Sequence, residues 1–406
     1  MSRPLRLLTF STLYPSSVRP GHGIFVETRL RELLSGGGIE AKVVAPVPWF
    51  PFTHPRFGEY AKMAATPRRE QRNGLDVLHP RYLLPPKVGM AIAPDSLARG
   101  AARAIDQLLD EGFEFDVIDA HYYYPDGVAA AWLARRYGKP LTITARGTDL
   151  NLIPQNARAR RRIHEAALQA DASIGVCRAL IDVLRDWGLP EQKLHVFRNG
   201  VDLERFRPTD QAKAREELGL VGAGPWLISV GYLVERKGHH LSIEALAQLG
   251  KSHPEARLVL VGQGEEERAL RALAQRLGVA DRVIFAGPQP NVDLYRWYSA
   301  ADLFILASSR EGWANVLLES MACGTPVVAS SIWGTPEVVS DPAVGMLVAE
   351  RSGPAFAAAI AAQLAKQADR RHVRRYAEGF SWQATSDAQR ELFSRLALGQ
   401  KAARSK

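Results

Sequence analysis

The sequence predicts an α/β protein made of two doubly wound domains, each with a parallel sheet. The chain has 406 residues, which is too long for one ordinary core when a domain averages about 150 residues. It is 46% hydrophobic and 23% charged, the composition of a folded globular protein and not of a disordered one. Short, continuous apolar runs alternate with segments of helical periodicity, as in parallel strands that are buried on both faces.

The composition also limits the compartment and the partners. Cys177 and Cys323 lie in separate apolar stretches, so neither a disulfide framework nor a metal cluster is expected. No window approaches the roughly 18 apolar residues of a membrane span, and we expect a cytoplasmic protein, with peripheral contact to the inner face of an anionic plasma membrane as a further option. The net charge of +9 favours an anionic partner. No nucleic-acid motif accompanies it, so we expect no nucleic acid.

The first half alternates strands and helices from its first apolar run. The expected strands are residues 5–10, 40–45, 115–120, 140–145, 172–176 and 193–197. Between the second and third of these strands, residues 46–86 are expected to be irregular. Their aromatic and basic side chains suit an interfacial or acceptor-binding surface, and equally a structural segment that covers the sheet edge.

The second half repeats the same alternation with short loops. Its expected strands are residues 226–230, 257–261, 282–286, 302–307, 325–329 and 345–348. Expected helices at 313–323, 352–366 and 370–378 precede a last helix and a basic tail, residues 399–406, which we expect to be disordered.

One stretch of the second half has the features of a ligand site. Glu311 follows a buried strand and precedes a helix, the place where open α/β sheets bind ligands. Glu319 lies eight residues later, about 12 Å away at helical rise, so both carboxylates can face one cleft. The expected free amides of Ala314, Asn315 and Val316 can bind a diphosphate. Taken alone, the two acids are ordinary solvated residues of a helix.

Two further segments can contact phosphate. Arg236 and Lys237 follow a strand, where fixed cations can neutralise a leaving diphosphate without a metal. The first strand is followed by a loop with Gly21 and Gly23, which can direct backbone amides at a phosphate. This loop is not a G-x-G-x-x-G fingerprint, which argues against a nicotinamide enzyme.

These motifs resemble those of retaining glycosyltransferases of family 4. EGWANVLLESMACGTPVVAS is similar to that family's EGFxNVxLEAMAxGxPVVAS, and RNGVDLERFRP to its NGVDxxxFxP hinge. The resemblance extends over nearly the whole chain. It implies the GT-B fold, with an acceptor domain at residues 1–200, a nucleotide-sugar donor domain at 201–380, and a helix in 381–406 that crosses back to the first domain.

The resemblance also implies roles for the motif residues. Glu319 would bind the ribose hydroxyls and Glu311 a hydroxyl of the donor sugar, while Arg236 and Lys237 bind the diphosphate. Further donor contacts are implied for Gly21, Gly23, Gly262, Ala314, Asn315 and Val316.

On the acceptor side, His121 would lie beside the donor sugar and share a proton. Arg146 and Asp149 occupy RGTD, where the family usually has HGxD. The arginine replaces the expected histidine, and its guanidinium suits a phosphate or carboxylate on the acceptor.

The implied activity is retaining transfer of a hexosyl group to a glycan or lipid-linked acceptor in cell-surface polysaccharide biosynthesis. The donor would be a nucleotide-diphosphate sugar, and no metal or other cofactor is expected. Two alternatives remain at this point. One is a nucleotide-sugar epimerase, and the other is a non-catalytic nucleotide-sugar-binding scaffold in an assembly complex.

Overall fold

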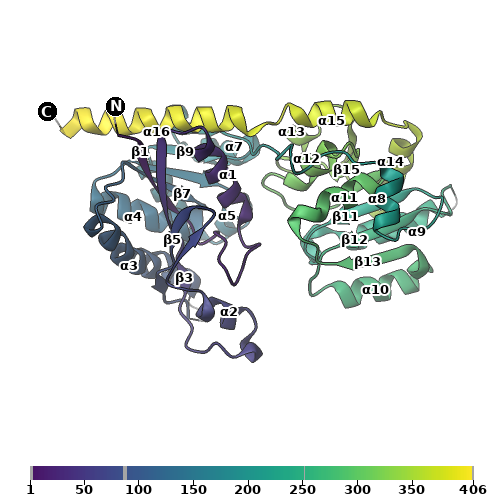
Figure 1. The fold of residues 1–406 in the computed structure, drawn as a ribbon, viewed down its shortest axis with the longest axis horizontal. Coiled ribbons are helices and arrows are strands. Elements are labelled where there is room, and N and C mark those ends of the chain that lie inside the picture. Colours follow the sequence, from purple (N-terminus) through teal and green to yellow (C-terminus); the bar gives the residue numbers. More distant parts are fainter. Residues whose placement is uncertain (1–2, 86–88, 251, 405–406) are drawn as a thin grey trace. The chain divides into compact units, whose positions relative to one another are not determined.

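The computed structural model describes residues 3–85, 89–250 and 252–404, and it divides the chain into two compact units. The N-terminal unit comprises residues up to Arg198 together with those from Gln383, and the C-terminal unit is Asn199–Trp382. Both units contain a parallel sheet between helices (Figure 1). The α/β class predicted from the apolar runs is confirmed.

The sheet of the N-terminal unit has eight strands in the order β10-β9-β8-β7-β1-β2-β5-β4. All neighbours are parallel except β4 and β5, which form an antiparallel edge. The strands are β1 (Leu5–Phe10), β2 (Ile39–Val44), β4 (Arg69–Arg72), β5 (Leu75–Leu78), β7 (Val117–His121), β8 (Leu141–Ala145), β9 (Ala172–Gly175) and β10 (Leu194–Val196). The order steps outward from β1 in both directions, which is the doubly wound arrangement.

Helices cover both faces of this sheet. They are α1 (Ile24–Ser35), α2 (Glu59–Ala65), α3 (Gly89–Asp110), α4 (Val128–Tyr137), α5 (Thr148–Asn151), α6 (Ala157–Gln169), α7 (Arg178–Asp186) and α16 (Trp382–Arg404). Val26 and Leu30 of α1 pack with Phe393 of α16 against Leu7 of β1 and Val43 of β2. Figure 1 shows α16 lying along this unit beside β1 and α1.

The last helix is tied to the N-terminal unit by polar contacts as well as by its core residues. The guanidinium of Arg29, which is 1% exposed, donates to Gln389 Oε1 at 3.0 Å and to the carbonyl of Phe197 at 2.9 Å. Thr385 donates to the carbonyl of Arg198. The helix reaches Arg404, so the disordered tail expected from residue 399 is wrong as far as that residue, and the last two residues lie outside the described part.

The segment expected to be irregular contains regular structure. It includes α2, the hairpin β4–β5 and the short parallel pair β3 (Val47–Pro48) and β6 (Arg81–Tyr82). Asn73 and Gly74 link β4 to β5, and both have positive φ angles, 48° and 79°. Asn-Gly with positive φ at both positions is typical of the tight turns that join antiparallel strands.

The sheet of the C-terminal unit has six parallel strands in the order β13-β12-β11-β14-β15-β16. They are β11 (Trp226–Val230), β12 (Arg257–Val261), β13 (Val283–Gly287), β14 (Leu303–Leu306), β15 (Val327–Ser330) and β16 (Gly345–Val348). The helices are α8 (Gln211–Glu217), α9 (His239–Leu249), α10 (Glu267–Arg276), α11 (Leu294–Ala300), α12 (Asn315–Ala322), α13 (Thr335–Val338), α14 (Gly353–Ala365) and α15 (Arg370–Glu378). Since β11 and β14 are neighbours, the loops after these two strands meet at one edge.

No helix in the described part of the chain is both long enough and apolar enough to cross a bilayer.

Candidate active site

The loops after β11 and β14 bring the predicted phosphate and sugar residues together. The amide of Ser309 donates to the carbonyl of Arg236 at 2.8 Å, which fixes the β14 loop against the short 3-10 turn Glu235–Lys237. Lys237 Nζ lies 2.6 Å from Glu311 Oε1. These side chains are 13% and 11% exposed, so the ion pair is open to a ligand but largely shielded from water.

The charge state of Glu311 depends on this lysine. Burial alone would raise the pKa of Glu311. The charge and hydrogen bond of Lys237 act against burial together with weaker effects such as the charge of Arg236, and the pKa lies below its usual value. The carboxylate is therefore ionised at neutral pH and can accept hydrogen bonds from hydroxyl groups.

Glu319 lies in a different environment on α12. Its Oε2 accepts a hydrogen bond from the hydroxyl of Tyr298 at 2.9 Å, and Tyr298 is fully buried in α11. Burial raises the pKa of Glu319 to about 7, against the effect of the Tyr298 hydrogen bond. The two acids thus differ in charge near neutral pH. No pattern in the sequence marked Tyr298 as a partner.

The structure corrects the expected start of the helix between the two acids. We expected it from residue 313, but α12 begins at Asn315, with Ala314 as its cap. The chain from Glu311 to Ala314 is not helical, so the helical spacing assumed for the two carboxylates does not apply. The amide of Asn315 donates to the carbonyl of Trp313 at 3.1 Å and is not free as predicted. The cause is a tight turn that ends the loop before the helix begins.

Two glycines of this edge are required by close packing of the backbone. Gly262, after β12, has a φ of 149°, and a Cβ atom there would lie 1.9 Å from the carbonyl oxygen of Gly231. Gly238, at the start of α9, would place a Cβ 2.1 Å from the carbonyl oxygen of Ala307. These contacts explain both glycines by themselves, and a contact of Gly262 with a nucleotide stays a prediction.

In the N-terminal unit, the predicted glycine loop follows β1 and precedes α1. Gly23 has a φ of 66°, and a Cβ atom there would lie 2.3 Å from the carbonyl oxygen of Leu13. A Cβ at Gly21 would meet nothing within 4 Å. Buried Asp126 fixes the start of the loop, because it accepts hydrogen bonds from the amide and hydroxyl of Thr12 at 2.7 and 2.9 Å.

His121 ends β7 and is 1% exposed. Its Nε2 lies 3.1 Å from Asp119 Oδ2, and its Nδ1 accepts a hydrogen bond from the guanidinium of Arg146. A guanidinium can only donate, so the ring proton is on Nε2 and points to Asp119. Burial lowers the pKa of His121 to about 4 although Asp119 opposes it, and the charge of Arg146 lowers it further.

Arg146, at the position where the family usually has a histidine, therefore fixes the orientation of the His121 ring. Arg146 holds the ring of His121 in one tautomer, and neither ring nitrogen can bind a sugar hydroxyl unless one of these bonds opens. Asp149 lies close by and accepts hydrogen bonds from the amides of Tyr123, Arg146 and Gly147 at 2.7 to 3.0 Å. Its carboxylate orders the loop after β8. The sequence did not indicate Asp119 as a partner of His121.

Family models match both halves of the chain. Residues 29–205 match "Glycosyltransferase Family 4", and residues 210–380 match "Glycosyl transferases group 1". The two matches account for most of both structural units.

Several curated proteins are similar to the chain over much of its length. D-inositol 3-phosphate glycosyltransferase 2 of Catenulispora acidiphila is 33% identical over 69% of this chain and 71% of its own. A putative teichuronic acid biosynthesis glycosyltransferase of Bacillus subtilis is 29% identical over 88% of both chains. The match spans 65% of D-inositol 3-phosphate glycosyltransferase of Segniliparus rotundus and 59% of its Acidothermus cellulolyticus counterpart, less than two thirds of either.

Solved structures show the same fold. Sucrose-phosphate synthase of Thermosynechococcus elongatus superimposes with a TM-score of 0.80 at 22% identity, over 98% of this chain and all of its own. Anabaena HepE in complex with UDP-glucose superimposes with a TM-score of 0.70 at 21% identity, over 96% and 99% of the two chains. With the GT-B fold and matches to both family models, the chain belongs to glycosyltransferase family 4.

Proposed function

We propose that the protein transfers a sugar from a nucleotide-diphosphate sugar to a hydroxyl group of a glycan or a lipid-linked acceptor. The observation that carries this proposal is the ion pair of Lys237 and Glu311 at the end of the central strands β11 and β14. A nucleotide-diphosphate sugar has a phosphate next to a sugar with hydroxyl groups. A lysine that is hydrogen-bonded to a carboxylate suits this pair of groups, because the lysine can bind the phosphate and the carboxylate can bind a sugar hydroxyl. HepE, which shares the fold, is described as a complex with UDP-glucose.

In this proposal, Lys237 and Arg236 bind the diphosphate and stabilise the negative charge that develops on it as the glycosidic bond breaks. Glu311 accepts a hydrogen bond from a donor-sugar hydroxyl, and Glu319 accepts those of the ribose. Lys237 must then be shared between Glu311 and the diphosphate. The ion pair keeps both side chains in place before the donor arrives, which lowers the cost of ordering them on binding.

The stereochemical outcome that we propose is retention. The bond between the sugar's anomeric carbon and the phosphate oxygen breaks, and the acceptor oxygen forms its bond on the same face of the ring. The proton of the acceptor hydroxyl passes to the leaving phosphate. His121 is proposed to shape the sugar site as a neutral ring, since Arg146 and Asp119 occupy its nitrogens. We propose no metal in this step, because Lys237 and Arg236 can supply two positive charges to the diphosphate.

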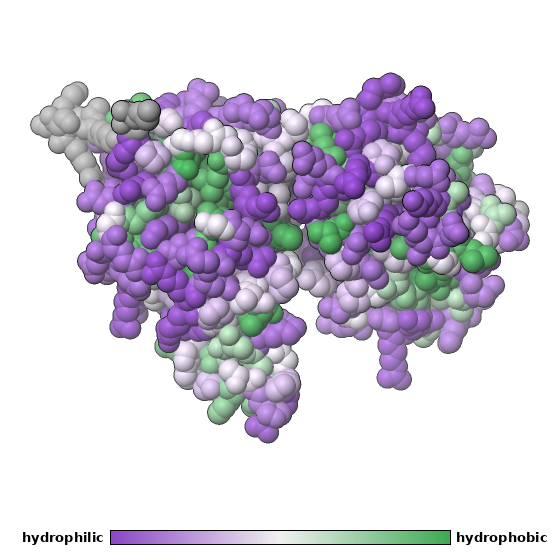
Figure 2. Space-filling model, viewed as in Figure 1, coloured by the Kyte–Doolittle hydropathy of each residue, from purple (hydrophilic) through white to green (hydrophobic). Residues whose placement is uncertain are grey.

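Arg146 and Asp149 are proposed to order the acceptor side, and a role in cell-surface polysaccharide synthesis fits the Bacillus subtilis relative that is named for teichuronic acid biosynthesis. We also propose a cytoplasmic enzyme with peripheral membrane contact through the lobe around α2. Trp49, Phe52 and Tyr60 of that lobe are each more than half exposed. Figure 2 shows this lobe at the bottom of the N-terminal unit as a mostly pale and green surface with purple residues at its edge.

A two-stage experiment tests the proposal. A thermal-shift screen against uridine, guanosine and adenosine diphosphate sugars identifies the donor, because a ligand that binds only the folded state raises the melting temperature. Hydrolysis or transfer from that donor is then measured in the presence of EDTA for the wild type and for the double variant Arg236→Ala/Glu311→Ala. We expect activity that EDTA leaves unchanged and that the double variant loses.

Full activity of the double variant would contradict the proposed donor site. Conversion of the donor to another nucleotide sugar without any acceptor would instead identify an epimerase. NMR analysis of the anomeric configuration of the product decides between retention and inversion.

A further inference from the structure

A second group of basic residues lies in the N-terminal unit, at the end of β5. Arg68, Arg81 and Arg103 line a hollow of about 300 Å³ between this strand and the middle of α3. We name it the arginine hollow. Its volume is at the lower end of the range for small-molecule sites. None of the described residues that line it is an aspartate or a glutamate.

Close packing of α3 against β6 builds the hollow. A Cβ atom at Gly100 of α3 would lie 2.5 Å from the carbonyl oxygen of Arg81, so this contact needs a glycine. Arg103 lies three residues later, one turn further along the helix, and therefore on the same side of α3 as Gly100. The helix thus presents its arginine to the segment that carries Arg81.

Arg81 is held in place by neutral partners. Its guanidinium donates to the backbone carbonyls of His79, Ala64 and Thr66, and it is half-buried. Burial lowers the pKa of Arg81, and the nearby charge of Arg68 lowers it further. Carbonyl groups orient the guanidinium but do not neutralise it, so a positive charge is fixed at the wall of the hollow.

Two carboxylates close in sequence to residues that line the hollow are engaged by other groups. Glu70 lies 2.9 Å from His79 Nε2 and also accepts hydrogen bonds from the amide of Ser17. Glu111 accepts a hydrogen bond from Arg69 at 2.6 Å and another from Gln107. Both acids have their own cation or donors, and neither is available to the arginines of the hollow.

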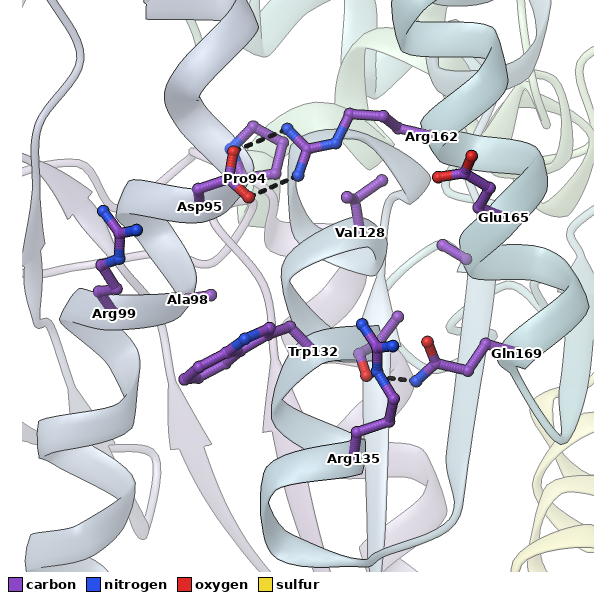
Figure 3. Close-up of a pocket in the computed structure, with 12 residues that line it drawn as sticks. Pro94, Asp95, Ala98, Arg99, Val128, Trp132, Arg135, Arg162, Glu165 and Gln169 are labelled. Carbon is purple, nitrogen blue, oxygen red and sulfur yellow. Dashed lines mark hydrogen bonds and ion pairs between the residues drawn. The ribbon is translucent and has the colours of Figure 1, made fainter.

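A second groove, on the neighbouring side of α3, has a different balance of charges from the arginine hollow. It lies between α3, α4 and α6, has a volume of about 490 Å³ and is lined by both acids and arginines. In Figure 3, Arg162 faces Asp95 through two hydrogen bonds of 2.6 and 2.9 Å. Glu165 accepts a hydrogen bond from Arg161 at 2.9 Å. Both acids that line this groove are paired within the protein, and its charge is therefore mixed, whereas no acid lines the arginine hollow among the described residues.

We propose that the arginine hollow binds a phosphate group. Guanidinium groups such as those of Arg68 and Arg103 can donate paired hydrogen bonds to phosphate oxygens, and the fixed charge of Arg81 adds to the attraction for a group with several anionic oxygens. The phosphate belongs to a free phosphate or pyrophosphate ion or to a lipid headgroup. Exposed Leu83 and Leu84 follow β6 directly, which would suit the second source. This site is in the N-terminal unit and does not depend on the proposed donor site.

Arginine footprinting tests the proposal residue by residue. The full-length protein is treated with phenylglyoxal, which modifies accessible guanidinium groups, and the rate at each arginine is read by mass spectrometry. Millimolar pyrophosphate should slow the modification of Arg68 and Arg103 several-fold. Arg161, whose side chain is 82% exposed and bonded to Glu165, is the internal control and should keep its rate.

Variants give the second measurement. Arg81 is avoided because its hydrogen bonds hold the loop. In Arg68→Gln we expect the pyrophosphate concentration that half-protects Arg103 to rise about tenfold, the effect of losing one charge-assisted contact. The matched variant Arg161→Gln should leave that concentration unchanged. Equal sensitivity in the two variants would mean that general surface charge attracts the ion, and it would overturn the site.

A further footprinting experiment with lipid vesicles tests whether the phosphate belongs to a lipid headgroup or to a soluble ion. Phosphatidylglycerol vesicles are compared with phosphatidylcholine vesicles, in which choline masks the phosphate charge, and with pyrophosphate alone. Protection of Arg68 and Arg103 by phosphatidylglycerol vesicles in addition to pyrophosphate supports a headgroup site, and protection by pyrophosphate without protection by either kind of vesicle supports a site for a soluble phosphate. Unchanged rates in all three arms would overturn the proposal, whatever the result for the sugar donor.

Discussion

The polar cluster at the edge of the C-terminal sheet and the one around His121 in the N-terminal unit are built differently. In the first, Lys237 and Glu311 hold each other while both remain partly exposed, and the Glu319 carboxylate accepts a hydrogen bond from the Tyr298 hydroxyl. In the second, His121 is buried between Asp119 and Arg146 with both ring nitrogens engaged. The first cluster can exchange its partners for those of a ligand, whereas the second fixes one geometry.

The largest expected effect comes from removing the cation of the first cluster. Lys237→Ala should lower kcat/KM for transfer by about 10²–10³-fold, the usual cost of losing one group that stabilises transition-state charge. It also removes the charge that keeps the pKa of Glu311 low. Steady-state kinetics measures this, with Lys213→Ala as the control, since the Lys213 side chain is 74% exposed. Equal losses in both variants would contradict the role of the ion pair.

The second largest expected effect is a pH dependence of protein stability that arises from His121. The pKa of His121 lies at about 4 in the folded protein, below its ordinary value of 6.5. Below pH 6.5 the unfolded chain takes up a proton that the folded protein does not, so stability falls as the pH is lowered. Between pH 7 and pH 5 this contributes about 2 kcal/mol.

Chemical denaturation of the wild type and of His121→Gln at the two pH values measures this contribution. The variant should lose less stability on acidification than the wild type. An equal loss would show that His121 titrates at its ordinary pKa and that its burial, together with the charge of Arg146, does not keep it neutral.

The smallest expected effect is a pH dependence of donor binding, which distinguishes Glu319 from Glu311. Because the pKa of Glu319 is about 7, its carboxylate is mostly protonated at pH 6 and mostly ionised at pH 8. Donor affinity should rise about tenfold across this interval, since ribose hydroxyls need an ionised acceptor. Calorimetric titration at several pH values should show this rise in the wild type. In Glu319→Gln the affinity should be flat, and a persisting rise would assign the titration to another group.

The same raised pKa has the opposite sign for stability. The unfolded chain releases the proton of Glu319 near pH 4.5, while the folded protein keeps it until about pH 7. Stability therefore falls as the pH rises through this window, when the unfolded state binds fewer protons. Donor binding and folding thus place opposite demands on this carboxyl group.

The sequence predicted the buried strands well because their apolar runs are continuous. Residues 5–10 were expected and observed as β1, and residues 226–230 as β11. The hairpin β4–β5 was missed because Arg69–Arg72 is a polar edge strand without an apolar run, although Asn73-Gly74 marks its turn. For a strand of this kind, the turn is a stronger signal than hydrophobicity.

The positions of the candidate residues at strand ends could be predicted, but their contacts could not. Which atom faces which depends on the loops, so no spacing in the sequence indicated the 2.6 Å pair of Lys237 and Glu311 or the bond from Tyr298 to Glu319. The replacement at Arg146 was visible in the sequence. Its contact with His121 needed the structure, because β7 and β8 place these residues side by side.

The position of α16 has a consequence for biosynthesis. Phe393 and Ala397 belong to the same core as Leu7 of the first strand, although almost the entire chain separates them. During translation, the N-terminal unit cannot complete its core until the codons for Phe393 and Ala397 have been read. By then the unit Asn199–Trp382 already has all of its own residues. A premature stop before Phe393 would therefore remove core residues of the earliest-made part of the molecule.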